Sequence, residues 1–212
     1  MGLGQNGLSL GILVSGNGTN LQAIIDATLE GRLEAKLKLV LSDQPDAFAL
    51  KRAEKHRIPH EVVDRKKFPN REAFEERVIE HLETHKVNLV VLAGFMHLLS
   101  ASFINRTRGR IVNIHPSLLP AFPGLKAVRQ ALEGGVRYTG CTVHFVDEGV
   151  DNGPIIGQSV VPVLETDTEE ELAERTHTEE RKLYPAVLKL LAEGRVTCPQ
   201  KGRRVVIRGG SS

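Results

Sequence analysis

Short apolar runs alternate with amphipathic segments through the first half of the chain, and this rhythm constrains the fold more than any other feature. Strands are predicted at 8–14, 37–41, 59–63, 87–93 and 111–115, and helices at 20–30, 47–56 and 71–85. The run 87–93 is apolar along nearly its whole length, which is typical of a strand buried on both faces. Strands and helices that alternate in this way predict a parallel sheet with helices on both sides.

The later part of the chain follows a different pattern. Predicted strands at 140–146 and 154–163 are joined by the short, turn-rich segment 147–153, which has no room for a crossover helix, so we expect antiparallel neighbours. A capping box, Thr168-Glu-Glu-Glu171, predicts a helix that runs to about residue 192, with Pro185 expected to kink or divide it. The predicted fold class is a single-domain α/β protein with a Rossmann-like, mostly parallel sheet flanked by helices and an antiparallel strand pair toward the C-terminus. We expect one domain over residues 1–197 and a flexible tail over 198–212.

Composition narrows the classes of partner. A net charge of +2 and an aromatic content of 4% without tryptophan argue against a nucleic-acid partner. Neither a basic-then-apolar leader nor an apolar run of membrane-spanning length is present, which predicts a cytoplasmic protein without a membrane partner. Cys141 and Cys198 do not have the spacing of a metal site, and we expect free thiols.

The segment Asn113-Ile-His-Pro-Ser-Leu-Leu-Pro120 carries the strongest chemical signal. Asn113 and His115 lie two residues apart in a predicted strand, so their side chains point to the same side. Pro116 then removes a backbone donor and ends the regular structure. A neutral amide donor beside an imidazole suits reactions in which an oxyanion forms and protons move.

The loop Ser15-Gly-Asn-Gly-Thr-Asn20 lies between the first predicted strand and the first predicted helix. Glycines and the free amides at a helix N-terminus favour a bound phosphate. The loop is not a Walker sequence, and Leu21 stands where the dinucleotide fingerprint has its third glycine. Two interpretations stay open: a strand–helix turn that needs glycine dihedrals, or a site for the phosphate of a mononucleotide-like ligand.

Further candidate residues have structural alternatives as well. Asp151 could serve only its own turn, His144 could point toward His115, and the three side chains together could form a zinc site. The segment 95–99 follows a buried strand, so it is either core or the wall of an apolar ligand pocket. The basic cluster 106–110 is either a solvated face or a contact for an anionic substrate.

Together these motifs resemble the phosphoribosylglycinamide formyltransferases, a family of folate-dependent enzymes of purine synthesis. The resemblance covers about residues 9–194 and rests on the 15–25 loop and helix start, on 90–96, 113–120 and 123–124, and on 140–145 and 151–154. It implies transfer of the formyl group of 10-formyltetrahydrofolate, the co-substrate, to the amine of phosphoribosylglycinamide, without a metal. The partners it implies are small molecules, and we expect a monomer or a homodimer.

The resemblance also implies residue roles. Asn113 and His115 would stabilise the oxyanion and move protons, and Asp151 would orient His115 and assist removal of the amine proton. Residues implied to bind the ribonucleotide are Gly18, Thr19, Asn20, His177, Thr178, Glu179 and Glu180. Residues implied to bind the folate are Arg71, Met96, His97, Leu98, Leu99, Asn113, Asp147, Glu148, Gly149, Val150 and Asp151.

Three rival functions are weighed against this one. A formyltetrahydrofolate deformylase, in which water replaces the amine, would be expected to carry an N-terminal regulatory extension. A methionyl-tRNA formyltransferase would need a C-terminal RNA-binding domain, for which too few residues remain. A non-catalytic phosphoribosyl- or folate-binding module would have no need for Asn113, His115 and Asp151 together.

Overall fold

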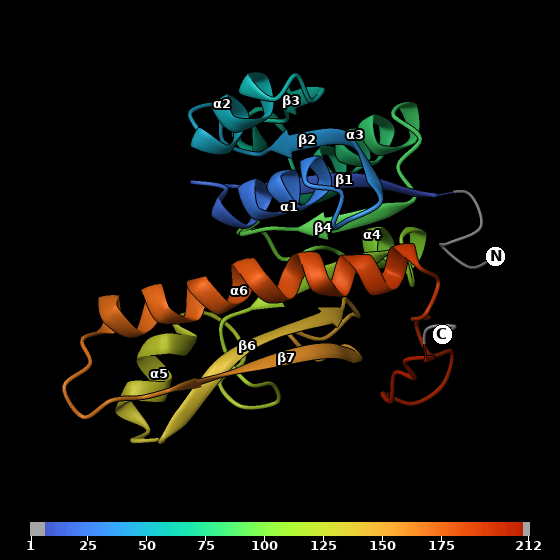
Figure 1. Cartoon of the computed structure of the whole chain (residues 1–212). Coiled ribbons are helices and arrows are strands. Elements are labelled where there is room, and N and C mark those ends of the chain that lie inside the picture. Colours follow the sequence, from blue (N-terminus) through green and yellow to red (C-terminus); the bar gives the residue numbers. More distant parts are fainter. Residues whose placement is uncertain (1–6, 210–212) are drawn as a thin grey trace.

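The computed structural model describes residues 7–209 and contains a seven-stranded sheet between two layers of helices (Figure 1). The strands lie in the order β3-β2-β1-β4-β5-β6-β7. The elements along the chain are β1 (Leu8–Val14), α1 (Thr19–Leu29), β2 (Ala35–Ser42), α2 (Phe48–Lys55), β3 (His60–Val62), η1 (Arg65–Lys67), α3 (Arg71–Thr84), β4 (Leu89–Leu92), α4 (Ala101–Arg106), β5 (Ile111–His115), α5 (Ala127–Glu133), β6 (Tyr138–Phe145), β7 (Ile155–Pro162) and α6 (Glu169–Ala192).

Strands β1 to β5 are parallel to their neighbours, as the alternation of apolar and amphipathic segments predicts. β6 is antiparallel to β7, which confirms the predicted pair. It is also antiparallel to β5, with Asn113 directly opposite His144. The fold prediction is therefore confirmed, and β6 is the strand that runs against the others in the described part of the sheet.

The two faces of the sheet bury separate hydrophobic clusters. Alternate residues of β1, including Leu10 and Ile12, face the layer of α1, α2 and α6, while Leu13 faces α3 and α4. All four residues of β4 are buried, as predicted for a strand covered on both sides. The sheet thus has the three-layer arrangement that follows from period-two alternation.

The longest helix, α6, is continuous across Pro185. Of the two expected effects of this proline, division of the helix is therefore wrong, and a kink stays a prediction. A proline inside a helix removes one backbone donor, while the flanking turns keep theirs. Here Tyr184, Val187 and Leu188 are buried against the sheet on either side of Pro185, and this packing holds the helix together. The predicted capping box at Thr168 and Glu171 is present.

The chain folds back after α6. Val196 forms an antiparallel bridge with Ile207, and the backbones of Arg195 and Arg208 are hydrogen-bonded at 3.0 Å. Residues 207 and 208 of the segment predicted as a flexible tail therefore lie beside the residues that follow α6, and residues 210–212 lie outside the described range. Among residues 7–209, no helix is long and apolar enough to cross a membrane.

Candidate active site

The strand order reverses between β1 and β4, and open α/β sheets bind ligands beside the carboxyl ends of the strands at such a point. A cleft of about 330 Å³ lies there. It is lined by the loop after β1, by the segment after β4, by the end of β5 and by two residues of α6. The lining residues are Ser15 to Asn20, Ala93, Gly94, Met96, Ile114, Pro116, His177 and Glu180.

The glycine loop forms one wall of this cleft. Gly18 has φ of 70° and caps α1, and a Cβ there would lie 2.7 Å from the Cβ of Ala49. Only glycine meets both conditions, because other residues rarely adopt this φ and the space is filled. The structure thus confirms a strand–helix turn that needs glycine at residue 18 and shows that the turn opens on the cleft, while the phosphate site stays a prediction.

The segment after β4 is fastened to the glycine loop. The Ser15 amide donates to the Gly94 carbonyl at 3.0 Å, and the Met96 amide donates to the Ser15 hydroxyl at 2.9 Å. Phe95 packs against the core, whereas Met96 and Leu98 are about two-thirds exposed. The segment is therefore core on one side and exposed apolar surface on the other, and its part in a ligand pocket stays a prediction.

Asn20 and Glu180 meet inside the cleft although 160 positions separate them in the chain. The Asn20 Nδ2 donates to Glu180 Oε2 at 2.9 Å, and both side chains are buried. Burial raises the pKa of Glu180, and the hydrogen bond from Asn20 offsets part of that rise. A buried carboxylate at the wall of a cleft is a candidate for binding hydroxyl groups.

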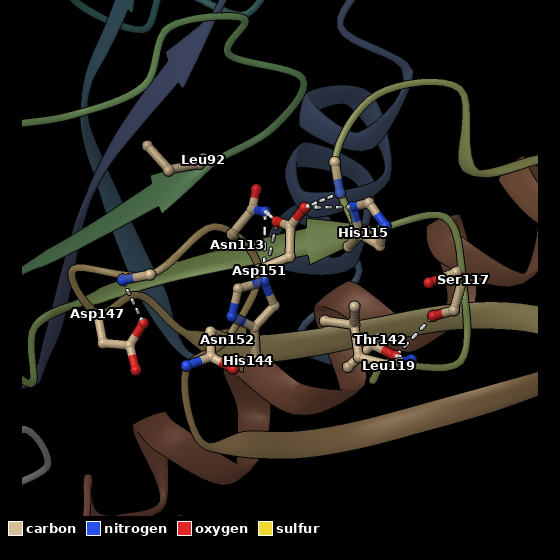
Figure 2. A network of polar contacts seen from close by, with 12 residues as sticks. Leu92, Asn113, His115, Ser117, Leu119, Thr142, His144, Asp147, Asp151 and Asn152 are labelled. Carbon is tan, nitrogen blue, oxygen red and sulfur yellow. Dashed lines mark hydrogen bonds and ion pairs between the residues drawn. The ribbon is translucent and has the colours of Figure 1, made fainter. Parts of the chain in front are cut away.

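The carboxylate of Asp151 lies at the centre of a second cluster (Figure 2). Its Oδ2 is 3.2 Å from His115 Nδ1 and accepts from the Gly124 amide at 2.8 Å. Its Oδ1 is 3.5 Å from Asn113 Nδ2 and 3.8 Å from His144 Nε2. The structure therefore brings the three predicted catalytic residues together, with His144 beside them.

Each ring nitrogen of His115 lies close to an oxygen atom. Its Nε2 is 2.8 Å from the Phe122 carbonyl, and its Nδ1 faces Asp151. A carbonyl and a carboxylate only accept, so this arrangement suits a ring that carries a proton on both nitrogens. Such a ring can hold a proton for transfer while the neighbouring carboxylate balances its charge.

His144 has a different environment. Its Nδ1 donates to the Phe145 carbonyl at 2.8 Å, and burial lowers its pKa, so the neutral ring presents an unprotonated Nε2. Asn113 Nδ2 lies 3.4 Å from that nitrogen. His144 therefore turns the amide group of Asn113 toward Asp151. Within residues 7–209, no cluster of three or more His, Cys, Asp and Glu side chains is arranged to hold a metal ion.

The other predicted ribonucleotide residues are divided between two sides of α6. His177 and Glu180 line the cleft, whereas Thr178 donates to the Glu174 carbonyl and Glu179 bonds Ser159 and Lys182. The basic cluster 106–110 lies before β5, at the other end of that strand from His115. Arg106 there pairs with Glu76 and Glu83, which supports a solvated face.

The predicted folate residues outside the Asp151 cluster lie in the segment after β4, in the loop 147–151 and at the start of α3. His97 Nε2 is 2.8 Å from the buried Asp43, and Leu99 packs against the core. The loop 147–151 runs beside Asn113, with Val150 exposed. Arg71, at the start of α3, is half-exposed.

The structure also shows partners that sequence reasoning missed. The Phe122 carbonyl contacts His115, and the Gly124 amide donates to Asp151. Both are backbone groups, and nothing in the residue types at these positions indicates such a role. The Pro123-Gly124 pair marks a turn there, but not its target.

Comparison with known proteins identifies the class. Residues 9–188 match the family described as formyl transferase. The chain therefore belongs to the formyltransferase family. It is 45% identical over 180 residues to the phosphoribosylglycinamide formyltransferase of Bacillus subtilis, covering 85% of this chain and 92% of that protein.

Other relatives place the same unit in longer proteins. The trifunctional purine biosynthetic protein adenosine-3 of Drosophila pseudoobscura is 47% identical, and the match covers 91% of this chain but only 14% of that protein. Curated relatives of this trifunctional type are thus matched over a small part of their length.

Solved structures of similar proteins have the same fold. Glycinamide ribonucleotide transformylase 1 from Symbiobacterium toebii has a TM-score of 0.92 and 49% identity, covering 96% of this chain and 95% of that one. A formyltetrahydrofolate deformylase from Pseudomonas syringae has a TM-score of 0.87 but 27% identity, and the match covers 67% of that chain.

Proposed function

We propose that this protein transfers the formyl group of 10-formyltetrahydrofolate to the glycinamide amine of 5'-phosphoribosylglycinamide, in de novo purine synthesis. The observation that carries the proposal is that Asn113 and His115 both lie against the Asp151 carboxylate. This cluster is next to a cleft that has the glycine loop as one wall. The products are the N-formyl ribonucleotide and tetrahydrofolate.

The reaction makes one carbon–nitrogen bond and breaks another. The amine nitrogen attacks the formyl carbon, and the carbonyl oxygen becomes an oxyanion in the tetrahedral intermediate. The bond to folate N10 then breaks as the oxyanion collapses to the new amide. One proton leaves the amine and one arrives at N10, so the net reaction needs proton carriers but no oxidant or reductant.

The cluster can supply what this chemistry needs. Asn113 would donate from its amide to the oxyanion, where charge develops. His115 would give its proton to the oxyanion or to N10 by exchanging one of its two oxygen partners for the substrate. Asp151 would balance the imidazolium and accept the amine proton, directly or through water.

The cleft suits the ribonucleotide. Gly18, Thr19 and Asn20 would bind the phosphate at the start of α1, where free amides and the helix dipole favour an anion. His177 and Glu180 would meet the ribose hydroxyls across the cleft. Thr178 and Glu179 would support that helix, because Thr178 donates to the Glu174 carbonyl within α6 and Glu179 accepts from Ser159 on β7.

The folate would lie between the two loops on the other side of the cluster. Met96 and Leu98 offer apolar surface to a flat ring, with His97 and Leu99 anchoring their segment, and the 147–151 loop closes the opposite side. Arg71 would meet the folate carboxylates. In this proposal residues 1–197 are the formyltransferase domain, and the protein works in the cytoplasm as a monomer or homodimer.

One assay separates the proposal from its nearest rival. Purified protein is mixed with 10-formyltetrahydrofolate, with and without the ribonucleotide, and tetrahydrofolate is followed over time. We expect product only when the ribonucleotide is present, together with a ribonucleotide heavier by one formyl group. Equal rates in both reactions would identify a deformylase, and binding without turnover a non-catalytic module.

The role of His115 is tested by replacing it with alanine. We expect His115→Ala to lower kcat by about 10²–10⁴-fold, the usual contribution of a general acid, while the Kd for folate stays near that of wild type. Turnover is measured at saturating substrates and folate binding by calorimetry. Wild-type turnover in this variant would contradict the assigned roles.

A further inference from the structure

The loop between β5 and α5 holds both ionisable members of the catalytic cluster through its backbone. The Phe122 carbonyl is 2.8 Å from His115 Nε2, and the Gly124 amide donates to Asp151 Oδ2 at 2.8 Å. Backbone groups occupy these positions whatever side chains the loop carries. The geometry of the cluster therefore depends on whatever fixes the loop.

Thr142, on β6, fixes the first half of this loop. Its hydroxyl donates to the Ser117 carbonyl at 2.7 Å and accepts from the Leu119 amide at 3.1 Å (Figure 2). The side chain is fully buried, with an exposed fraction of 0%. One hydroxyl thus bonds the loop at two points, in a place that water does not reach.

Gln158 completes the attachment from the edge strand β7. Its Nε2 is 2.9 Å from the Leu119 carbonyl and 2.9 Å from the Thr142 hydroxyl. Thr142 and Gln158 lie opposite each other on β6 and β7. Leu118 fits over Gly140, where an added Cβ would lie 2.8 Å from its Cδ2. Residues 117–119 of the loop are therefore docked on the outer strands of the sheet, while Pro116, just before them, lines the substrate cleft.

We propose that Thr142 and Gln158 are positioning residues that set the orientation and proton location of His115. Thr142 lies opposite His115 in the β5–β6 ladder, but its hydroxyl bonds the loop, as the Gln158 amide does, and neither polar group bonds the imidazole. Both groups act through the loop from Ser117 to Phe122. The inference rests on the proposed function, because the effect on rate is an effect on formyl transfer. Its structural part concerns the ring of His115 and can be measured without turnover.

Removing the Thr142 hydroxyl alone breaks the chain of contacts. Thr142→Val keeps the shape of the side chain but leaves the Ser117 carbonyl and the Leu119 amide buried without that partner. The loop then relaxes, and the Phe122 carbonyl leaves His115 Nε2. The Nε2 of His115 then has no acceptor in the loop, and the ring can rotate.

The matched control lies on the same strand. Thr139 is as buried as Thr142, at 1%, but its hydroxyl has no hydrogen-bond partner. Thr139→Val therefore makes the same chemical change without touching the loop. Thr142→Ser keeps the hydroxyl and tests rescue, and Gln158→Leu tests the second positioning residue at an exposed site where folding is tolerant.

The experiment combines steady-state kinetics with ¹⁵N NMR of the labelled imidazole rings, in which His115 is identified by its loss in His115→Ala. For Thr142→Val we expect kcat to fall by about 10²-fold, as small misplacements of reacting groups do, with the KM for the ribonucleotide little changed. We also expect the His115 ¹⁵N shifts to move. Thr142→Ser should recover most of both properties, and Thr139→Val should resemble wild type.

A Thr142→Val protein with a lowered Tm but wild-type kcat and wild-type His115 shifts would overturn the inference. If Thr142→Val does not fold, Gln158→Leu decides: a lower kcat with moved shifts supports the inference, and wild-type values overturn it. Failure of the proposed function looks different. Wild-type protein would then form no formylated ribonucleotide, while the NMR comparison would still report the position of His115.

Discussion

Two residues that contact His115 have backbones in the left-handed region. Phe122 has φ of 54° and Asp151 has φ of 48°, and neither is glycine. Such conformations are uncommon for residues with a side chain, and strained backbones of this kind cluster at functional sites. The protein thus uses unfavourable backbone geometry to bring a carbonyl and a carboxylate to opposite sides of one imidazole.

Glu180 is a second residue that lowers the stability of the fold while it contributes to the cleft. Burial raises its pKa, so the folded protein holds the proton more tightly than the unfolded chain does. Ionisation therefore opposes folding, and the stability of the protein falls as pH rises above the ordinary pKa of glutamate. At neutral pH the protein tolerates this cost in return for a carboxylate in the cleft.

Glu180→Gln should therefore raise Tm, and by more at about pH 8 than at about pH 5, because the amide never ionises. Its oxygen can still accept from Asn20. Binding of the ribonucleotide should weaken in the same variant. Calorimetric scans at both pH values measure the first effect and titration the second, and an equal Tm difference at the two pH values would contradict the pKa argument.

At the scale of elements, the turn between β6 and β7 brings Asp151 back over β5. Gly153 allows this path, because a Cβ there would lie 1.8 Å from the Phe145 carbonyl oxygen. The Phe145 amide also bonds the Pro154 carbonyl at 2.9 Å. The two chains are too close for any side chain at residue 153.

Gly153→Ala should destabilise the protein by about 1–3 kcal/mol or more, as overpacking does, and should lower kcat because Asp151 moves. The matched control is Gly209→Ala, where an added Cβ meets nothing within 4 Å. Chemical denaturation and turnover check both. Unchanged stability in Gly153→Ala would show that the turn can follow another path.

Most elements could be predicted from the sequence because their apolar periodicity is local. β1 and β5 match the predicted ranges, and α3 differs by one residue at its end. The short helices α4 and α5 were missed, since six or seven residues are too few for a clear helical period. The pairing of β6 with β5 depends on contacts between distant segments, which periodicity does not contain.

Some features of the site could likewise be predicted from the sequence, and others could not. Asn113 and His115 share one short strand, so their common direction follows from sequence. The nearness of Asn20 to Glu180, and of Phe122 to His115, follows only from the folded chain. Strand-end position still marked the right edge of the sheet, because parallel strands gather their carboxyl ends there.

At the scale of the whole molecule, Tyr184 ties a helix to the sheet. Its hydroxyl lies 2.9 Å from the Leu92 carbonyl and 3.1 Å from the Val112 carbonyl, on neighbouring strands β4 and β5. The ring is fully buried, and burial raises the pKa of the phenol well above its ordinary value, so it remains a donor. One side chain thus joins α6 to the two strands that lead into the site.

Tyr184→Phe should cost about 1–3 kcal/mol, because it leaves two buried carbonyls without this donor. For a chain of this size that corresponds to a fall in Tm of about 2–4 °C per kcal/mol. Thermal unfolding measures the effect. Phe103→Leu, in the other core layer, removes packing but no hydrogen bond, and comparing the two separates these causes. An unchanged Tm in Tyr184→Phe would show that the Tyr184 hydroxyl does not stabilise the fold.

The same helix carries His177 and Glu180 in the cleft and Leu188 and Leu191 in the core. With the binding mode proposed above, a ribonucleotide bound to α6 would also resist the opening of the core, and at a hundredfold excess over Kd it would stabilise the fold by about 2.7 kcal/mol. Proteases act on chains that have opened. The lifetime of the protein in a cell would then depend on the concentration of the ribonucleotide. Protein without bound ribonucleotide would be degraded faster than protein that has it bound.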